Sequence, residues 1–393
     1  MENNWNLEVL YTSFDSQEFL HDMKKLDHAI QSFTDWSNHI TQDEDNSREK
    51  LEEYINKSID LGLLMGKLDQ FTNLTLSVDA TNEEAEKYRT ILVQKSSLLT
   101  APDSKVMSWI SNLEAIKITI ASSELLKQHE YFLNEIVSQE KYRLSEKEED
   151  IISHMENTGS TAWENYKDLL IATHTVLLEE NGVPTPTPLT KALNLATDAS
   201  SQVRKSAYEA ELASYKNIEA GLCASLNAIK GEVLTVCKMR GYESPLEMSL
   251  TSSRMSKKTL DALWGAIEES LPSFRKYLRK KAEVLGHKNG LPWYDMYAPV
   301  VDVDVEYSYD YAKKFVVDCF RSFSDNLADY ADHAINNRWI DVYPKEGKVG
   351  GAFCAGLDSI KECRFLLNYG DSFNDISTMA HEIGHGFHNW TVK

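Results

Sequence analysis

Apolar residues recur at gaps of three and four along most of the chain, the spacing of helices that bury one face. Residues 203–236 carry this pattern at Leu212, Tyr215, Ile218, Leu222, Leu226, Ile229, Val233 and Val236. We expect one long helix there, with a continuous buried stripe that ends before Gly241. Residues 82–101 and 106–142 predict two further helices. The predicted fold class is mainly α.

A proline-rich segment, NGVPTPTPLT, interrupts the helical pattern. Proline lacks a backbone N–H and restricts the residue before it, so Pro184, Pro186 and Pro188 cannot continue a helix and favour an extended chain. We therefore predict a Pro/Thr linker at residues 184–190. It would join an N-terminal helical lobe, residues 1–183, to a second lobe, residues 191–393.

Strand patterns are concentrated late in the chain. They are WIDVYP from Trp339, VGGAFCAGL from Val349 and RFLLNY from Arg364. Each is short, rich in aromatic or aliphatic residues, and bounded by Gly, Pro, Lys or Asp. We expect a small β-sheet next to the helix that follows.

The final segment, GDSFNDISTMAHEIGHGFHNW, predicts an amphipathic helix from about Asn374 to about Trp390. Ser372 and the acidic residue three positions later form a capping pattern, in which the hydroxyl accepts from free N–H groups of the first turn. The buried stripe would consist of Ile376, Ala380, Ile383 and Phe387.

His381 and His385 on such a helix differ by about 40° of rotation and about 6 Å of rise, so both imidazoles can reach one ion. Zinc suits two neutral imidazoles. Glu382 lies about 100° away and need not be a ligand. It can instead take a proton from a water on the metal, the general-base role of zinc peptidases. The motif therefore predicts a zinc-dependent peptidase.

A catalytic zinc needs three protein ligands, and the motif supplies two. His388 is about 10.5 Å of rise from His381, too far to share one ion on a straight helix. It is more simply a residue near the substrate or a polar surface position. Asp371 or Asp375 could fold back as ligands, but Asp375 is better explained as a cap. The predicted site is incomplete.

The charge balance bears on partners and location. The formal charge is −20, from 61 acids and 41 bases. Such a surface repels nucleic acid and anionic membranes, so neither is an expected partner. The chain begins without a secretory signal and has no apolar run long enough for a membrane span. Its five cysteines lack metal-binding spacing, which favours reduced thiols and the cytoplasm.

Long stretches of the chain resemble the oligoendopeptidase F family, relatives of thimet oligopeptidase. The resemblance is carried by WIDVYPKEGKVGGAFCAGLDSIKECRFLLNYGDSFNDISTMAHEIGHGFHN and, before it, by IKGEVLTVCKMRGYESPLEMSL and ESLPSFRKYLRKKAEVLGHKNGLPWYDMYAP. It implies a two-lobed, mostly helical zincin-type peptidase that cleaves short peptides in a channel, with zinc on His381 and His385 and Glu382 as base.

The same resemblance implies which residues contact the peptide. An edge strand before the metal helix, here Phe365 to Tyr369, would pair with the substrate backbone. That RFLLNY is only core sheet is the open alternative. The substrate residues implied are Gly351, Ala352, Phe353, Leu366, Leu367, Asn368, Tyr369 and His388.

In this family the third ligand is a glutamate further along the chain, and the oxyanion-stabilising groups follow it. We therefore expect this sequence to be the N-terminal part of such an enzyme and inactive alone. Missing helices would expose apolar faces, which favours a homodimer or a complementing C-terminal fragment. The alternative function is a non-catalytic fragment that binds peptides or partners. A structural zinc site is disfavoured, since such sites are closed and cysteine-rich.

Overall fold

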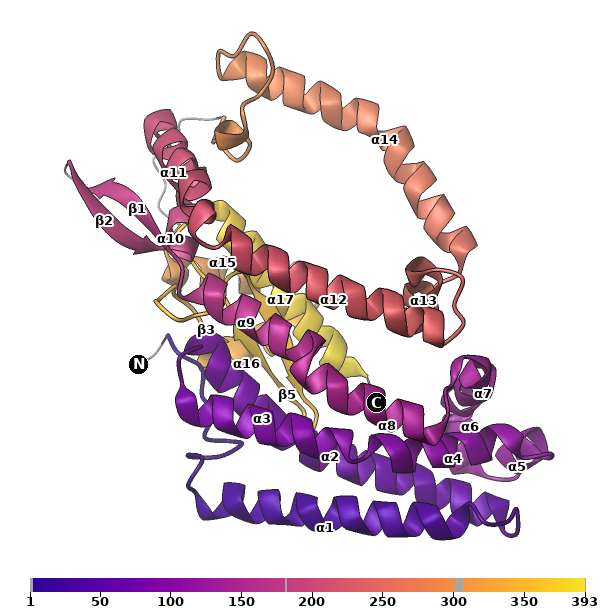
Figure 1. Ribbon diagram of the computed structural model, residues 1–393. Coiled ribbons are helices and arrows are strands. Elements are labelled where there is room, and N and C mark those ends of the chain that lie inside the picture. Colours follow the sequence, from indigo (N-terminus) through magenta and orange to yellow (C-terminus); the bar gives the residue numbers. More distant parts are fainter. Residues whose placement is uncertain (1–2, 181, 301–306, 393) are drawn as a thin grey trace.

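The computed structural model describes residues 3–180, 182–300 and 307–392. The protein is mainly helical, as predicted, with one β-hairpin and one three-stranded sheet among the described residues (Figure 1). No described helix combines the length and hydropathy needed to cross a membrane. All five cysteines are free.

The N-terminal part is a stack of helices. Its base is α1 (Gln17–Ile40), α2 (Ser47–Val78), α3 (Glu83–Ser97) and α4 (Thr100–Asn112), and α8 (Glu146–Thr158) and α9 (Ser160–Ala172) pack above them (Figure 1). Helix α1 buries residues at gaps of three and four, namely Phe19, Met23, Leu26, Ile30 and Phe33. The first four of these residues belong to the core beneath the small sheet, and Phe33 belongs to a second core with Leu51 and Tyr54 of α2.

Two of the predicted helices have different bounds from those expected. The helix expected at 82–101 ends at Ser97, and the single helix expected at 106–142 is wrong. It is divided among α4, α5 (Ile116–Ala121), α6 (Glu124–Gln128) and α7 (Glu130–Gln139). Ser123 caps α6 by accepting the N–H of Leu126, so the chain starts a new helix where the apolar spacing alone continues.

The proline-rich segment is extended, as predicted, and it forms one strand of a hairpin. β2 (Val183–Pro188) pairs antiparallel with β1 (Thr175–Glu180). The three prolines occupy alternate positions, so their missing N–H groups fall on the outer edge of the hairpin. The backbone N–H groups of the odd-numbered residues point toward β1. Leu189, the odd-numbered residue directly after β2, shows this by donating its N–H to His174 O at 3.2 Å. The division into lobes at this point stays a prediction.

The long helix predicted at 203–236 is wrong, because two helices occupy it. A 3-10 turn, Tyr215–Asn217, separates α11 (Ser201–Ser214) from α12 (Glu219–Met239). At this break Ser214 Oγ lies 2.9 Å from His174 Nε2, a tertiary contact that apolar spacing does not encode. The stripe is not continuously buried either, since Leu212 and Leu226 are exposed.

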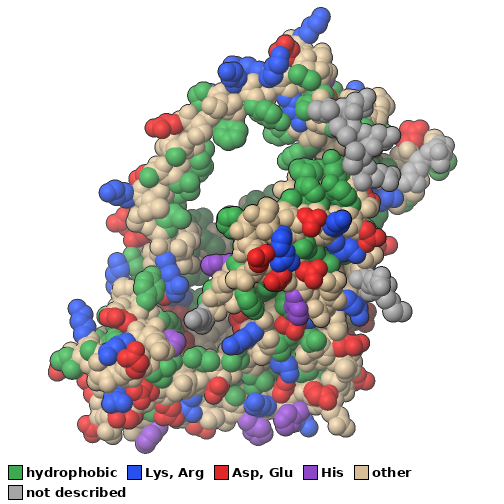
Figure 2. Space-filling model, turned by 180° about the vertical axis from the view of Figure 1, so that it is seen from behind, with side chains coloured by type: hydrophobic (Ala, Val, Ile, Leu, Met, Phe, Trp, Pro, Cys, Tyr) green, Lys and Arg blue, Asp and Glu red, His purple; other side chains and the backbone are tan. Residues whose placement is uncertain are grey.

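Helices α13 (Pro245–Ser252) and α14 (Lys257–Val284) form an arch that leaves the body of the molecule and returns to it near α11 (Figure 1). Figure 2 shows an opening under this arch with apolar side chains around it. Along α14 only Lys281 and Ala282 are buried. The large apolar residues Trp264, Phe274 and Tyr277 are exposed.

The three-stranded sheet has the order β3-β5-β4. Its strands are β3 (Ile340–Asp341), β4 (Phe353–Leu357) and β5 (Glu362–Leu366), in the places the sequence predicts. β5 is parallel to β3 and antiparallel to β4. Both faces are covered: Leu357 and Leu366 pack on the core of α1 and α2, while Cys363 and Phe365 pack toward the last helix.

The other face of the sheet is covered by α15 (Tyr309–Arg321), α16 (Asp325–Asn336) and α17 (Phe373–Thr391). Helix α17 approaches the sheet most closely at Gly386. A Cβ atom at this position would lie 2.5 Å from Phe365 Cζ and 2.5 Å from Tyr330 Oη. Only glycine therefore permits this packing distance.

We expect Gly386→Ala to destabilise the protein by about 1–3 kcal/mol, because the added methyl forces α17 away from Phe365 and Tyr330. Gly384→Ala is the matched control on the same helix, since a Cβ there meets nothing within 4 Å. It should be neutral or stabilising by up to about 1 kcal/mol, as for alanine in a helix interior. Chemical denaturation of the two variants measures the difference, and equal midpoints would contradict the close-packing explanation.

Candidate active site

The start of α17 is fixed by the capping box that the sequence predicts. Ser372 Oγ accepts the N–H of Asp375 at 3.3 Å, and Asp375 Oδ2 accepts the N–H of Ser372 at 2.9 Å. The side chain of Asp375 is thus used as a cap.

The rotation of α17 is fixed by its buried face. Ile376, Met379 and Ile383 are buried in the core against the sheet, with Gly386 at the closest approach. The predicted stripe included Ala380 and Phe387, which are only partly buried in the same core. The face about opposite carries His381 and His385, and both side chains are exposed.

The two imidazoles of the motif converge. His381 Nε2 and His385 Nε2 lie 3.0 Å apart. In a tetrahedral zinc site with Zn–N bonds of about 2.0–2.1 Å, two ligand nitrogens are separated by about 3.3 Å. The pair therefore fits a zinc ion after a shift of a few tenths of an ångström.

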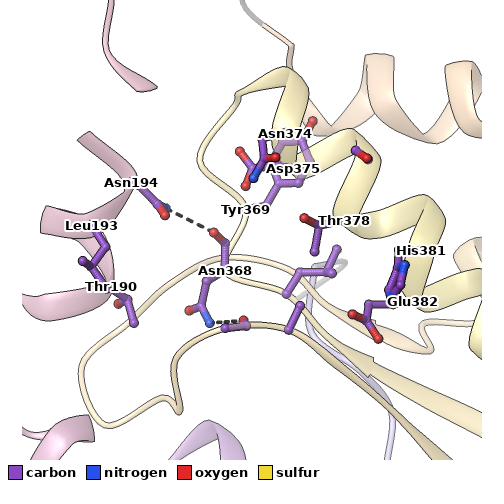
Figure 3. Close-up of a pocket in the computed structure, with 14 residues that line it drawn as sticks. Thr190, Leu193, Asn194, Asn368, Tyr369, Asn374, Asp375, Thr378, His381 and Glu382 are labelled. Atoms are coloured by element: carbon purple, nitrogen blue, oxygen red, sulfur yellow. Dashed lines mark hydrogen bonds between the residues drawn. The ribbon is translucent and has the colours of Figure 1, made fainter. Parts of the chain in front are cut away.

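Glu382 is the buried member of the motif, with 8% of its surface exposed. It and His381 line one end of a cavity of about 550 Å³, and Thr190, Leu193 and Asn194 of α10 (Leu189–Asn194) line the other (Figure 3). Glu382 is also close to Cys354 on β4. The hydrogen bond with Cys363, burial and the charge of Glu382 all raise the pKa of the Cys354 thiol. A neutral thiol thus lies behind the carboxylate.

Asn368 organises the middle of the cavity. Its side-chain Nδ2 donates to Val349 O at 3.0 Å and to Gly351 O at 2.8 Å, and its backbone carbonyl oxygen accepts from Asn194 Nδ2 at 3.1 Å (Figure 3). Gly351 has φ of 79°, a conformation that favours glycine. These bonds join the turn before β4, the end of β5 and helix α10 into one wall.

The cavity brings together most of the residues named from the sequence. Gly351, Ala352, Leu367, Asn368 and Tyr369 line it together with His381 and Glu382. No pattern in the sequence indicated a further group of lining residues, whose positions depend on how α10 packs and on the turn of α17 before the motif: Thr190, Leu193, Asn194, Ser377 and Thr378.

Four of the residues named from the sequence do not line the cavity: Phe353, Leu366, His385 and His388. His385, one turn after His381, is exposed beyond the lining. Leu366 is fully buried in the core of α1 and α2, and Phe353 packs against the same core beside Trp5. Both side chains point to the opposite face of the sheet, because alternate residues of a strand face opposite sides. His388 is exposed outside the cavity lining.

The prediction that Phe365 to Tyr369 is an edge strand is wrong. Phe365, Leu367 and Tyr369 donate their N–H groups to Trp339 O, Asp341 O and Val342 O, and β4 occupies the other side of β5. β5 is therefore the central strand.

β4 is an outer strand of the sheet, and its first residue follows Gly351 and Ala352, which line the cavity. The backbone N–H groups of odd-numbered β5 residues point toward β3. The backbone N–H groups of the even-numbered residues Arg364 and Leu366 therefore point toward β4, where these residues are paired with Ala355 and Phe353. The backbone groups of Cys354 and Gly356 consequently face away from the sheet. Of these, Gly356 O accepts from Gln70 Nε2 at 2.5 Å.

A third metal ligand is not provided by the described residues, in which no group of three or more His, Cys, Asp or Glu side chains could hold an ion. The two-histidine pair and the carboxylate beside it are thus the chemical groups the described part of the chain contributes.

Comparisons with known proteins identify the family of this chain. Residues 97–175 match the family model described as oligopeptidase F, and residues 194–392 match that of peptidase family M3. Group B oligopeptidase PepB of Streptococcus agalactiae is 22% identical over 98% of the chain, which spans 63% of that relative. Oligopeptidase PepF of Bacillus subtilis is 22% identical over 100% of the chain, which spans 58% of it. The chain thus covers less than two thirds of each.

Solved structures share the fold. PZ peptidase A, solved with an inhibitor, superposes with a TM-score of 0.74 at 14% identity, covering 94% of this chain and 63% of its own. Oligoendopeptidase-F from Enterococcus faecium gives 0.61 at 16% identity, covering 80% and 66%. Because the M3 family model matches more than half of its residues, this chain belongs to peptidase family M3.

Proposed function

We propose that this chain supplies two zinc ligands, the general base and a peptide-binding edge to a zinc-dependent endopeptidase that cleaves short peptides. The observation that carries the proposal is the 3.0 Å separation of His381 Nε2 and His385 Nε2, with Glu382 beside them in the wall of a cavity. Family membership supports the reaction class.

His381 and His385 would hold the zinc ion. When bound, zinc polarises the scissile carbonyl and lowers the pKa of water toward about 7. Glu382 would accept a proton from the attacking water on its carboxylate and return it to the leaving amine. Its place in the cavity wall keeps the carboxylate facing the substrate and away from bulk solvent.

A peptide would bind in extended form along the outer edge of β4. The backbone groups of Cys354 and the N–H of Gly356 face this edge, and Ala352 lines the cavity just before it. Antiparallel pairing gives the better hydrogen-bond geometry, so we place the peptide antiparallel to β4. Side chains of alternate peptide residues would then face α17 and its motif.

Two further features belong to the proposal. A third ligand would come from outside the described residues, since a catalytic zinc needs three. A cytoplasmic location is supported by the five free cysteines.

Zinc should bind this chain weakly, because two imidazoles are fewer than the three ligands of a catalytic site. Calorimetric titration with zinc chloride should show binding that is lost on gel filtration. His381→Ala and His385→Ala should each abolish it, whereas His388→Ala, on the same helix but outside the cavity, should not. Equimolar zinc that survives gel filtration would contradict the two-ligand site.

Peptide hydrolysis by this chain alone should be slow or absent. With protein in excess over a quenched peptide and zinc present, any cleavage should fall by about 10²–10⁴ in Glu382→Gln, the usual contribution of a general base. Mass spectrometry of the products measures it, with His388→Ala as the control. Cleavage that persists in Glu382→Gln, or after chelation, would overturn the mechanism.

The second candidate, a non-catalytic fragment that binds peptides or another polypeptide, is favoured by the exposed apolar residues along α14, such as Trp264 and Phe274. Under it, peptide affinity would be unchanged by chelation and no product would form. Under this candidate a second copy of the chain would cover this face, and sedimentation measures whether the chain associates with itself.

A further inference from the structure

The backbone pairing of β4 with β5 stops at the active-site cavity. Phe353, the first residue of β4, is paired with Leu366, the last residue of β5. The same register would place Gly351 opposite Asn368, because a step backward along β4 is a step forward along β5. Gly351 and Asn368 both line the cavity. The ladder of backbone hydrogen bonds therefore ends at the cavity wall.

Side chains replace the hydrogen bonds that Gly351 and Asn368 would exchange. In a regular ladder the backbone N–H of Asn368 would donate to Gly351 O, and Asn368 O would accept from the N–H of Gly351. Here the side-chain Nδ2 of Asn368 donates to Gly351 O at 2.8 Å and also to Val349 O at 3.0 Å. Asn368 O is turned toward α10, where it accepts from Asn194 Nδ2 at 3.1 Å (Figure 3). One side-chain amide thus binds two backbone carbonyls beyond the end of the ladder.

The bond from Asn194 depends in turn on Gly370. A Cβ atom at Gly370 would lie 2.7 Å from Asn194 Nδ2 and 3.2 Å from Asn194 Cγ. A side chain at this position would therefore displace the Asn194 amide from Asn368 O. The glycine lets α10 hold the backbone of Asn368 in this orientation.

The bond from Asn368 to Gly351 fixes the direction of both polar groups of Ala352. In a trans peptide unit the C=O and the N–H point in opposite directions. Gly351 O points toward Asn368, so the N–H of Ala352, in the same unit, points away from β5. The N–H of Phe353 points toward Leu366, so Ala352 O also points away from β5. Both groups therefore lie on the outer edge of the strand.

These two groups are available to a ligand. Among the described residues, neither the N–H nor the C=O of Ala352 has a hydrogen-bond partner in the protein. Of the outward-facing residues Ala352, Cys354 and Gly356, only Ala352 lines the cavity that contains His381 and Glu382. A peptide antiparallel to β4 would thus meet one complete donor and acceptor pair at this cavity.

Packing alone does not fix this direction. Ala352 carries only a methyl group, and it follows two glycines, whose backbones have the widest choice of conformations. The chain is held on either side of them, where Val349 donates its N–H to Ser77 O at 2.9 Å and where β4 begins. Between these two points, within the described structure, the backbone accepts a side-chain hydrogen bond only from Asn368.

We propose that Asn368 is a positioning residue for peptide binding. Its side-chain amide holds the N–H and the C=O of Ala352 outward, so that they pair with the backbone of one substrate residue. The proposal rests on the peptidase function proposed above, with its peptide along the edge of β4. It adds a residue whose effect on the peptide is transmitted through Ala352.

N-methylated peptides test this role, because N-methylation removes the donor that a peptide residue contributes to a strand edge. A fluorescein-labelled nonapeptide of Ala, Ser and Leu is made in versions that each carry one N-methylated residue. Fluorescence anisotropy gives their dissociation constants on the metal-free chain. The peptide residues that face Ala352 and Cys354 are two apart. Methylation of either should weaken binding about tenfold, whereas methylation of the residue between them should have little effect.

Asn368→Ala should act on one of these two positions. It should weaken binding of the unmodified peptide about fivefold and reduce the cost of methylation opposite Ala352 from about tenfold to less than about twofold. The cost opposite Cys354 should stay near tenfold, since Phe353 and Ala355 fix that part of β4 by pairing with β5. A general loss of structure would lower both costs together.

Two further variants complete the set. Asn368→Leu keeps nearly the volume of the side chain and removes its donors, so it gives the same measurement if Asn368→Ala does not fold. Asn374→Ala is the matched control, because it removes an amide from the same cavity that, among the described residues, does not bond the turn. It should keep both methylation costs. The thermal midpoint of each variant shows whether it is folded.

Hydrogen exchange of the parent chain gives a measurement that needs no variant. The unmodified peptide should slow exchange of the Ala352 amide, because this N–H donates to the peptide in the complex. Exchange at the same rate with and without bound peptide would overturn the assignment of Ala352 and with it the role of Asn368.

The outcomes separate the two proposals. Two alternate methylation costs that both persist in Asn368→Ala or Asn368→Leu overturn the positioning role and leave the peptide site at β4 intact. Peptide binding with no position-dependent cost, or no peptide binding at all, overturns both the role of Asn368 and the placement of the peptide at β4. The zinc titration described above is independent of each of these results.

Discussion

The geometry of the motif depends on how α17 packs on the sheet. Successive residues of a helix are rotated by about 100°, so the contact made by one face fixes the direction of every other side chain. Gly386 lets α17 come close to Phe365 and Tyr330, and Ile376, Met379 and Ile383 extend the same contact. His381 and His385 are thereby directed outward, and Glu382 is kept at the boundary. A looser contact would leave the i, i+4 spacing unchanged but would let the helix rotate about its axis.

The outer side of β3 is covered by residues near the N-terminus of the chain. Asn3 O accepts the N–H of Val342, and Asn6 donates its N–H to Arg338 O, so residues 3–6 lie along the outer side of β3. The side chain of Arg364 on β5 is fully buried, and its Nε donates to Asn6 O at 2.8 Å. With β3 covered in this way, β4 is the outer strand on the other side of the sheet. Residues more than 300 positions apart in the sequence thus determine which strand stays at the outer edge.

These dependences explain what the sequence could predict and what it could not. The capping box at Ser372, the strands and the i, i+4 histidines are local patterns, and each is in its predicted place. The order β3-β5-β4 is not local, which is why the edge was assigned to Phe365–Tyr369 and not to β4. The breaks at Ser123 and Ser214 come from side-chain hydrogen bonds that apolar spacing does not record. Likewise, Thr190 and Asn194 reach the cavity only through tertiary packing.

The arch is held differently from the body of the protein. Helix α14 buries little apolar surface, and the segment after it is attached by Arg204, Asp295, His287 and Lys281. Burial raises the pKa of Asp295, but the hydrogen bonds from Arg204 and His287 outweigh it and hold this pKa below its usual value. The ionised form is thus bound in the folded state, and its contribution to stability is lost only as the pH falls through this lowered pKa. A buried ion pair adds little net stability, since desolvation offsets the attraction, but its directional bonds admit few alternative positions. These polar contacts therefore fix the position of the 3-10 turn Trp293–Asp295. The shape of the cavity that Trp293, Arg204 and Asp375 line depends on that position.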